Sequence, residues 1–144
     1  MAFILIAESD PNVAERAADA LAAAGFACGW VTDADQTRTL LRCRQPDLIL
    51  LDANMPGRSE GHLLRELRSS EQCRDTPIIL LTAASGRDDP AKSADCGAQD
   101  FIRKPFDPRF LVWRVNHAVG MLEARPKLGE VSEWPVQQQH GSLG

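Results

Sequence analysis

The stretch that decides the fold is PDLILLDANMPG, residues 46–57. Its apolar run from Leu48 to Leu51 does not alternate with polar residues, which is typical of a strand covered on both faces in a parallel sheet. The run stops at the carboxylate of Asp52 and gives way to a turn that contains Pro and Gly. Open α/β sheets bind ligands at the carboxyl ends of their strands, so Asp52 lies where a functional carboxylate is expected. An Asp that only caps the turn is the alternative, and the other strand ends decide between the two.

Three other apolar runs also end in polar residues. They are Phe3 to Ala7, followed by Glu8-Ser9-Asp10; Ile78 to Leu81, followed by Thr82; and Phe101-Ile102, followed by Arg103-Lys104-Pro105. If these strands are parallel neighbours, their carboxyl ends bring carboxylates, a hydroxyl and an ammonium group to one edge of the sheet. A single carboxylate fits a turn residue, whereas the whole set predicts a functional site.

Helical segments separate the strands. They are expected at about 12–24, from 32 or 33 to 44, at 59–69, in a short segment after Asp89-Pro90 that ends near Gly97, and at 108–122, with a further strand at 26–31. Five β/α units with short links predict an α/β fold. Its core is a doubly wound, five-stranded parallel sheet with helices on both faces.

The ends of the helices carry their usual signals. Asp10 can cap the first helix with Pro11 at its first position, and Gly25 stops it. Either Thr32 or Asp33 caps the second helix. The last helix is expected to bury a stripe of four residues: Leu111, Val115, Ala118 and Leu122.

Composition excludes several classes of protein. The formal net charge is −4, the pI is about 5.3 and no Lys/Arg-rich stripe is present, so we expect no direct nucleic acid binding by this domain. No apolar run approaches the ~18 residues of a membrane span, and no basic segment typical of a signal peptide precedes the first strand. The four cysteines lack the spacing of metal or redox motifs and fit reduced thiols. These features predict a cytoplasmic protein that does not contact membranes.

The chain divides into two parts. Residues 1–122 carry the alternating pattern of a single domain, whereas residues 123–144 are rich in Pro, Gly and Gln and have no sustained periodicity. We expect a flexible tail or linker after the domain.

At this point the set of motifs is recognisable. The chain resembles the receiver domains of two-component response regulators over about residues 2–122. The resemblance rests on Glu8, the LLDANMPG turn, Thr82, Phe101 and the Lys104-Pro105 pair, in the order and near the spacing of that family. It implies a flavodoxin-like fold with strand order 2-1-3-4-5 and a cis peptide bond between Lys104 and Pro105.

The resemblance also implies a function. Asp52 would take a phosphoryl group from a histidine kinase or phosphotransfer protein, and Lys104 would supply a point charge to that group. Mg²⁺ would be held by Glu8, Asp52 and the main-chain carbonyl of Asn54. Without metal, Lys104 is expected to pair with Asp52. The protein would be a signalling switch for a downstream protein target or effector domain, not an enzyme with a turnover substrate.

One residue departs from the family pattern. Receiver domains usually carry two adjacent acidic residues after the first strand, and here the second position is Ser9. A neutral hydroxyl is a weaker ligand for Mg²⁺, so we expect a weakened metal site. The alternative function is a pseudo-receiver, in which the same fold serves as a phosphorylation-independent protein–protein interaction module.

Two further expectations concern the output. By resemblance, Thr82 moves toward the phosphoryl group and lets the aromatic ring of Phe101 turn inward; ordinary strand and core roles are the alternative. On the last helix, Phe110, Trp113 and His117 share a second stripe. This stripe is either partly buried against a neighbouring helix or a contact surface for a homodimer partner or downstream target.

Overall fold

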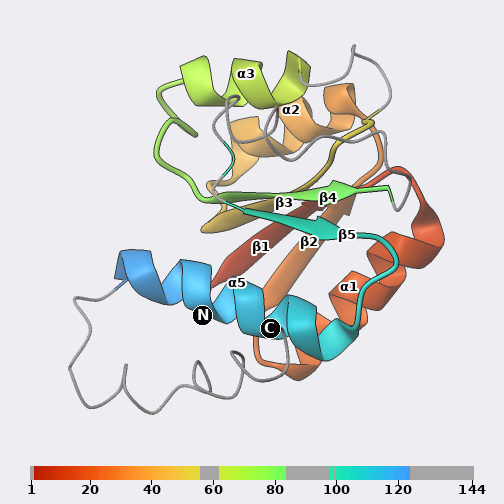
Figure 1. Cartoon of the computed structure of the whole chain (residues 1–144). Helices are drawn as coiled ribbons and strands as arrows, with labels where there is room; N and C mark the ends of the chain where they lie inside the picture. The colour runs from red at the N-terminus through yellow and green to blue at the C-terminus, as the bar shows by residue number, and fades with distance from the viewer. Residues whose placement is uncertain (1, 56–61, 84–97, 99, 124–144) are drawn as a thin grey trace.

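The computed structural model describes residues 2–55, 62–83, 98 and 100–123. Five parallel strands form one sheet in the order β2-β1-β3-β4-β5, as expected. The strands are β1 (Phe3–Ala7), β2 (Ala27–Val31), β3 (Leu48–Asp52), β4 (Ile78–Thr82) and β5 (Asp100–Arg103). Their arrowheads in Figure 1 point the same way, so the carboxyl ends of all five strands lie along one edge.

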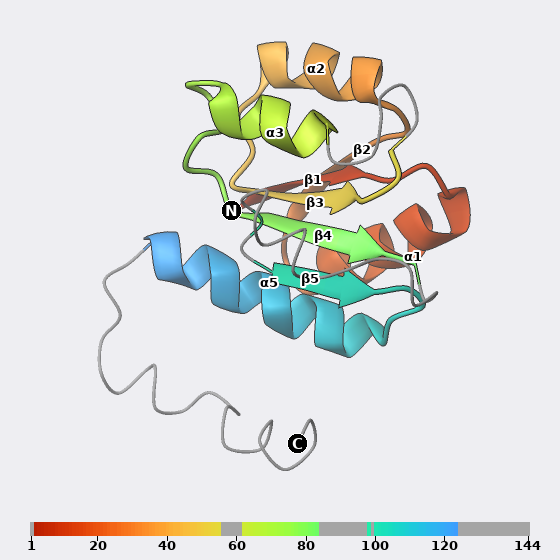
Figure 2. The ribbon, with the colours of Figure 1, turned by 45° about the horizontal axis from the view of Figure 1, so that its top comes forward.

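Helices cover both faces of the sheet. They are α1 (Pro11–Ala23), α2 (Ala34–Cys43), α3 (His62–Ser69) and α5 (Pro108–Glu123). Figures 1 and 2 show α1 and α5 on one face and α2 and α3 on the other. The expected short helix ending near Gly97, the start of the helix expected at 59–69, and all but the first residue of the expected tail lie outside the described residues.

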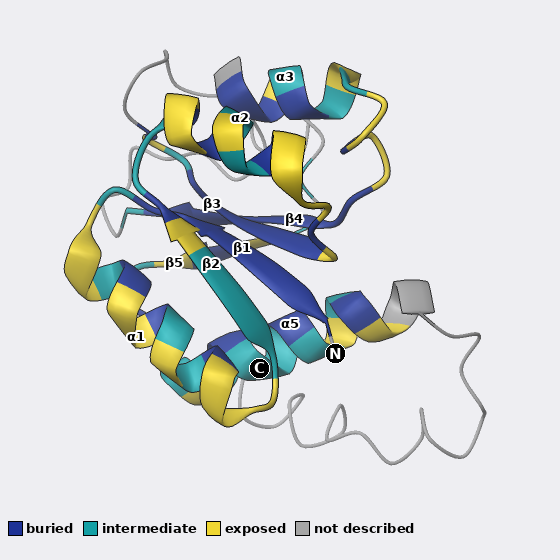
Figure 3. Cartoon of the chain, turned by 180° about the vertical axis from the view of Figure 1, so that it is seen from behind, coloured by how far each residue is buried: buried dark blue, intermediate teal, exposed yellow. Residues whose placement is uncertain are grey.

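The strands have no polar alternation because each face packs against helices. In β1, Ile4 and Ile6 belong to the cluster beneath α1 and α5, whereas Phe3 and Leu5 belong to the cluster beneath α2 and α3. The same division holds in β3 and β4. Figure 3 shows β1, β3 and β4 buried along their length, while the edge strand β2 is only partly covered.

The helix ends confirm the capping signals. The Asp10 side chain accepts a hydrogen bond from the N–H of Asn12 at 2.9 Å, and Gly25 takes a φ of +99° after α1. The cap of α2 is Asp33, which accepts from the N–H of Gln36 at 2.8 Å.

Of the predicted buried stripe of α5, the side chain of Leu122 lies outside the described residues, and one of the other three positions differs from the prediction. Leu111 and Val115 are buried as expected, but the next fully packed residue is Val119, and Ala118 is only partly buried. Within the described part of the chain, no helix combines the length and apolar composition that crossing a bilayer requires.

Candidate functional site

The register of the sheet brings the two predicted carboxylates together. Ala7 of β1 pairs with Leu51 of β3, so the next residues, Glu8 and Asp52, are neighbours at the carboxyl edge. Both continue the alternate positions of β1 and β3 that face α1 and α5. The two carboxyl groups therefore leave the sheet on the same side.

Among the residues that the structure describes, four hydrogen-bond donors hold Asp52, two on each oxygen. Oδ1 accepts from the N–H of Asn54 at 3.0 Å and from Nζ of Lys104 at 3.3 Å. Oδ2 accepts from the hydroxyl of Ser9 at 2.7 Å and from the Ser9 N–H at 3.3 Å. The residue is only 3% exposed. Desolvation works to raise the pKa of Asp52, but the donors from Asn54, Ser9 and Lys104 outweigh it and hold the pKa below its usual value.

Glu8 is fully buried beside Asp52. Nζ of Lys104 lies 3.3 Å from each of its carboxylate oxygens, and the N–H of Asp10 donates to Oε2 at 3.0 Å. Burial raises the pKa of Glu8, the neighbouring charge of Asp52 adds to this, and the hydrogen bond from Asp10 and the ammonium of Lys104 oppose it. The two carboxylates of one site are thus shifted in opposite directions.

Lys104 reaches the site from the loop after β5. Its N–H donates to the carbonyl of Thr82 at 2.7 Å, and its peptide bond to Pro105 is cis, as the resemblance implied. The predicted pairing with Asp52 is present, and Glu8 is a second partner that the sequence analysis did not foresee. Formally, two carboxylates and one ammonium leave the site with a charge of about minus one.

Thr82 and Phe101 occupy adjacent strands. Thr82 ends β4 and is buried, and Phe101 lies in β5, where it pairs with Leu80 and is 36% exposed. The ring of Phe101 is therefore open to solvent in this structure. The switch role of both residues stays a prediction.

The oxygen groups at this edge fit a hard divalent cation. Glu8 and Asp52 supply carboxylates, and the turn after β3 carries the main-chain carbonyl of Asn54. Among the residues that the structure describes, no group of three or more His, Cys, Asp and Glu side chains forms a metal cluster. The hydroxyl of Ser9 stands where a third acid would complete one. The residues present fit Mg²⁺ as a reduced ligand set, with water for the remaining positions.

Besides the ion pair between Lys104 and Glu8, two contacts at the site were not predicted from the sequence. The first is the hydrogen bond from the Ser9 hydroxyl to Asp52, because Ser9 was considered only as a metal ligand. The second is Trp30, which is 44% exposed and whose indole N–H donates to the carbonyl of Glu8 at 3.0 Å. The position of Trp30 near the end of the second strand was the feature of the sequence that could have indicated this contact.

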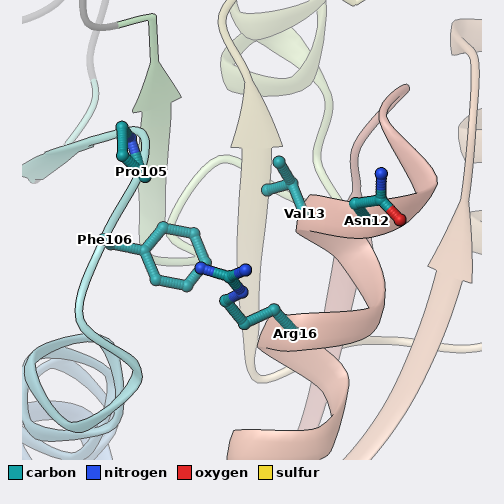
Figure 4. A pocket seen from close by; sticks show the side chains of 5 residues that line it. All are labelled: Asn12, Val13, Arg16, Pro105 and Phe106. Atoms are coloured by element: carbon teal, nitrogen blue, oxygen red, sulfur yellow. The ribbon is translucent and has the colours of Figure 1, made fainter.

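A small cavity lies next to the site, between the start of α1 and the loop after β5 (Figure 4). Its volume is about 120 Å³, and it is lined by Asn12, Val13, Arg16, Pro105 and Phe106. Pro105 directly follows Lys104, so the cavity adjoins the residues that hold the Asp52 carboxylate.

The aromatic stripe on α5 is divided between core and surface. Phe110 packs partly against the core, whereas Trp113 and His117 stack with ring centroids 6.0 Å apart and His117 is exposed. Arg114 pairs with Asp100 of β5 and lies 5.2 Å from the Phe110 ring centroid. Phe110 and Trp113 are both partly buried, as one of the two alternatives predicted, and an interface role for the stripe stays a prediction.

Comparisons with known proteins agree with this geometry. The sequence profile described as the response regulator receiver domain matches residues 4–116. The chain is 41% identical over 113 residues to the phosphate regulon transcriptional regulatory protein PhoB of Pseudomonas aeruginosa, covering 78% of this chain and 49% of PhoB. The chain spans about half the length of the curated relatives it matches.

Solved structures show the same fold. The signal receiver domain of a signal transduction histidine kinase from Syntrophus aciditrophicus matches with a TM-score of 0.78 and 32% identity, covering 88% of this chain and 96% of that one. The receiver domain of a sensor histidine kinase from Pseudomonas aeruginosa matches with a TM-score of 0.74 and 28% identity, covering 83% and 98%. That structure holds a magnesium ion in its active site cleft.

Proposed function

The chain belongs to the response regulator receiver domain family, and from this premise we propose that Asp52 is its phosphoacceptor. Receiver domains are signalling switches, and the family uses Mg²⁺ in its active site. The observation that best supports the proposal is the burial, ionisation and hydrogen bonding of the Asp52 carboxylate. A carboxylate that is nearly buried, held ionised and aimed by four donors at the carboxyl edge of the sheet is prepared to act as a nucleophile.

The reaction transfers one phosphoryl group. An oxygen of Asp52 forms a bond to phosphorus, and the bond from phosphorus to the imidazole nitrogen of a kinase phosphohistidine breaks, leaving its electron pair on that nitrogen. Nζ of Lys104 lies 3.3 Å from Oδ1 of Asp52, so it can pair with an oxygen of the phosphoryl group once that group is attached. Glu8, Asp52 and the Asn54 carbonyl would hold Mg²⁺, which supplies charge neutralisation for the phosphoryl oxygens.

The conformational change that follows phosphorylation would begin at Thr82. Its hydroxyl is one strand away from Asp52, at the end of β4, where it can hydrogen-bond a phosphoryl oxygen. The ring of Phe101, which is exposed in this structure, would move inward when Thr82 shifts. We propose that these two residues change the surface formed by β5 and α5, including Phe110, Trp113 and His117.

The partners follow from the same reasoning. The phosphodonor would be a histidine kinase or phosphotransfer protein, and the output would be a downstream protein target, an effector domain or a second copy of this chain. PhoB is named a transcriptional regulatory protein, but this chain covers only about half of it. The acidic domain itself is not proposed to bind nucleic acid.

A pseudo-receiver remains the second candidate because of one observation. With Ser9 in place of an acid, hydrogen bonds and Lys104 already satisfy Asp52 without a cation. Such a site could persist in a protein that binds its partner independently of phosphorylation.

The test is incubation with acetyl phosphate and Mg²⁺, followed by intact mass measurement. We expect one phosphoryl adduct, with acetate released, that is absent from Asp52→Asn. A receiver domain of known activity serves as the labelling control. A folded protein that gains no adduct while the control is labelled would reject the phosphoacceptor function in favour of the pseudo-receiver.

A further inference from the structure

Both oxygens of the Asp52 carboxylate already accept hydrogen bonds from the described residues. An ionised carboxylate has about four lone-pair positions on its two oxygens, and four donors occupy them here. A cation that binds this carboxylate therefore has to replace one of the four donors. The question is which donor gives way.

Two of the four donors are fixed by the backbone. The N–H of Asn54 belongs to the turn after β3, and the N–H of Ser9 follows Glu8, whose own N–H donates to the carbonyl of Val31 at 3.0 Å. Neither can leave Asp52 without moving a strand end. The movable donors are the side chains of Lys104 and Ser9.

Of these two, the Ser9 hydroxyl makes the closer contact and has the freer movement. It lies 2.7 Å from Oδ2, whereas Nζ of Lys104 lies 3.3 Å from Oδ1 and is also tied to Glu8. A hydroxyl turns about a single bond and carries no charge, so it can leave the carboxylate while Lys104 stays beside Glu8.

We propose that Ser9 is a positioning residue whose hydroxyl competes with a divalent cation for the Asp52 carboxylate. The hydrogen bond from the Ser9 hydroxyl to Oδ2 of Asp52 would have to break before Mg²⁺ could bind that carboxylate. The proposal rests on the function proposed above for the identity of the cation. It goes beyond the expectation from sequence, in which Ser9 weakens the metal site only because a hydroxyl is a poorer ligand than a carboxylate.

The two roles predict opposite signs for one substitution. If Ser9 is a ligand, Ser9→Ala weakens Mg²⁺ binding because an oxygen is lost. If Ser9 is a competitor, Ser9→Ala tightens it, because the metal-free state loses a hydrogen bond to a charged group. Such a bond is strong enough that we expect the Kd for Mg²⁺ to fall about tenfold.

The measurement is a Mg²⁺ titration of the full chain without phosphodonor. Trp30 is the probe, since its indole donates to the carbonyl of Glu8, and Trp30→Phe identifies its share of the emission. The rise in Tm with Mg²⁺ concentration gives the affinity independently of fluorescence. Circular dichroism checks that each variant folds.

Two further variants complete the design. Ser9→Thr keeps the hydroxyl and should bind Mg²⁺ like the wild type, whereas Ser9→Asp adds a carboxylate and should bind more tightly. An unchanged or higher Kd in Ser9→Ala overturns the proposal. Absence of Mg²⁺ binding in both the wild type and Ser9→Asp also overturns it. The phosphoacceptor function is judged separately, by the Asp52-dependent adduct.

Discussion

Nζ of Lys104 lies 3.3 Å from both carboxylate oxygens of Glu8, although 96 positions separate the two residues in the chain. In the sheet, β3 and β4 stand between the strands that carry them. The ion pair therefore crosses the carboxyl edge and holds the ammonium group beside Asp52. Substitutions at either end should change both stability and phosphoryl transfer.

Glu8→Gln should stabilise the protein at pH 7. Burial raises the pKa of Glu8, so the folded protein holds its proton more tightly than the unfolded chain does. The ionised Glu8 carboxylate therefore lowers the free energy of unfolding at pH values above its raised pKa in the folded protein. Below the pKa that Glu8 has in the unfolded chain, this destabilisation is absent. We expect a gain of about 1 kcal/mol at pH 7 that disappears in acid. Urea unfolding at both pH values checks it, and a loss of stability at pH 7 would contradict it.

Lys104→Met should slow phosphorylation by acetyl phosphate about 100-fold, because it removes the positive charge poised for the phosphoryl oxygens. It also leaves Glu8 and Asp52 as uncompensated neighbours. The rate of adduct formation, measured by intact mass, checks the prediction. Arg103→Met is the matched control, since Arg103 is the exposed neighbouring cation and should leave the rate unchanged. Equal slowing in both variants would assign the effect to general charge.

Thr82→Ala should separate phosphorylation from switching. The variant should still form the Asp52 adduct. The ring of Phe101 should stay as exposed as it is in this structure, because the Thr82 hydroxyl that would hydrogen-bond the phosphoryl group is missing. Fluorine NMR of the protein labelled with fluorophenylalanine reports the ring, with Phe101→Leu assigning its signal. Thr82→Ser should behave like the wild type. A phosphorylation-dependent shift that survives in Thr82→Ala would remove Thr82 from the switch.

Arg16→Glu should distinguish protein donors from small donors. Asp52 is nearly buried, so a donor protein has to contact the surrounding surface, and the cavity lined by Arg16 and Pro105 adjoins Lys104. We expect transfer from a cognate kinase to fall about tenfold, while acetyl phosphate labels the variant at the wild-type rate. Arg42→Glu, an exposed charge reversal near the end of α2, is the control. If labelling by the kinase is unchanged, the cavity lies outside the docking surface.

Trp113→Ala should weaken association through α5 by about tenfold if the aromatic stripe is an interface. Trp113 stacks on the exposed ring of His117, so the substitution removes the largest side chain of the stripe. Analytical ultracentrifugation of the phosphorylated chain and binding to its target measure the effect. Arg42→Ala, at an exposed position of α2, controls for the loss of a large side chain elsewhere on the surface. A monomeric protein with unchanged target binding would leave the stripe as helix packing only.

Periodicity and strand ends were sufficient to predict the sheet. The apolar run before Asp52 and the polar residues after the other strands predicted a parallel sheet and the cluster of Glu8, Asp52 and Lys104, because parallel strands align their carboxyl ends. The order of the strands came from the resemblance to receiver domains. The bond between Ser9 and Asp52 was not predictable in this way, since it depends on the direction of one hydroxyl.

Helix packing set a second limit. The periodicity of the last helix fitted Ala118 and Val119 almost equally, and the larger side chain is the one that fills the core. Neighbouring elements decide such a choice, and the helix alone does not contain the information.

The sequence separation between Asp52 and Lys104 determines when the site can form during protein synthesis. Lys104 follows Asp52 by 52 residues, and a nascent chain that has just completed β3 carries the acceptor without its ammonium partner. The cluster exists only after β5 has joined the sheet and the whole domain has folded as a unit. Under the function proposed above, truncated or half-made chains would therefore lack a site able to accept a phosphoryl group.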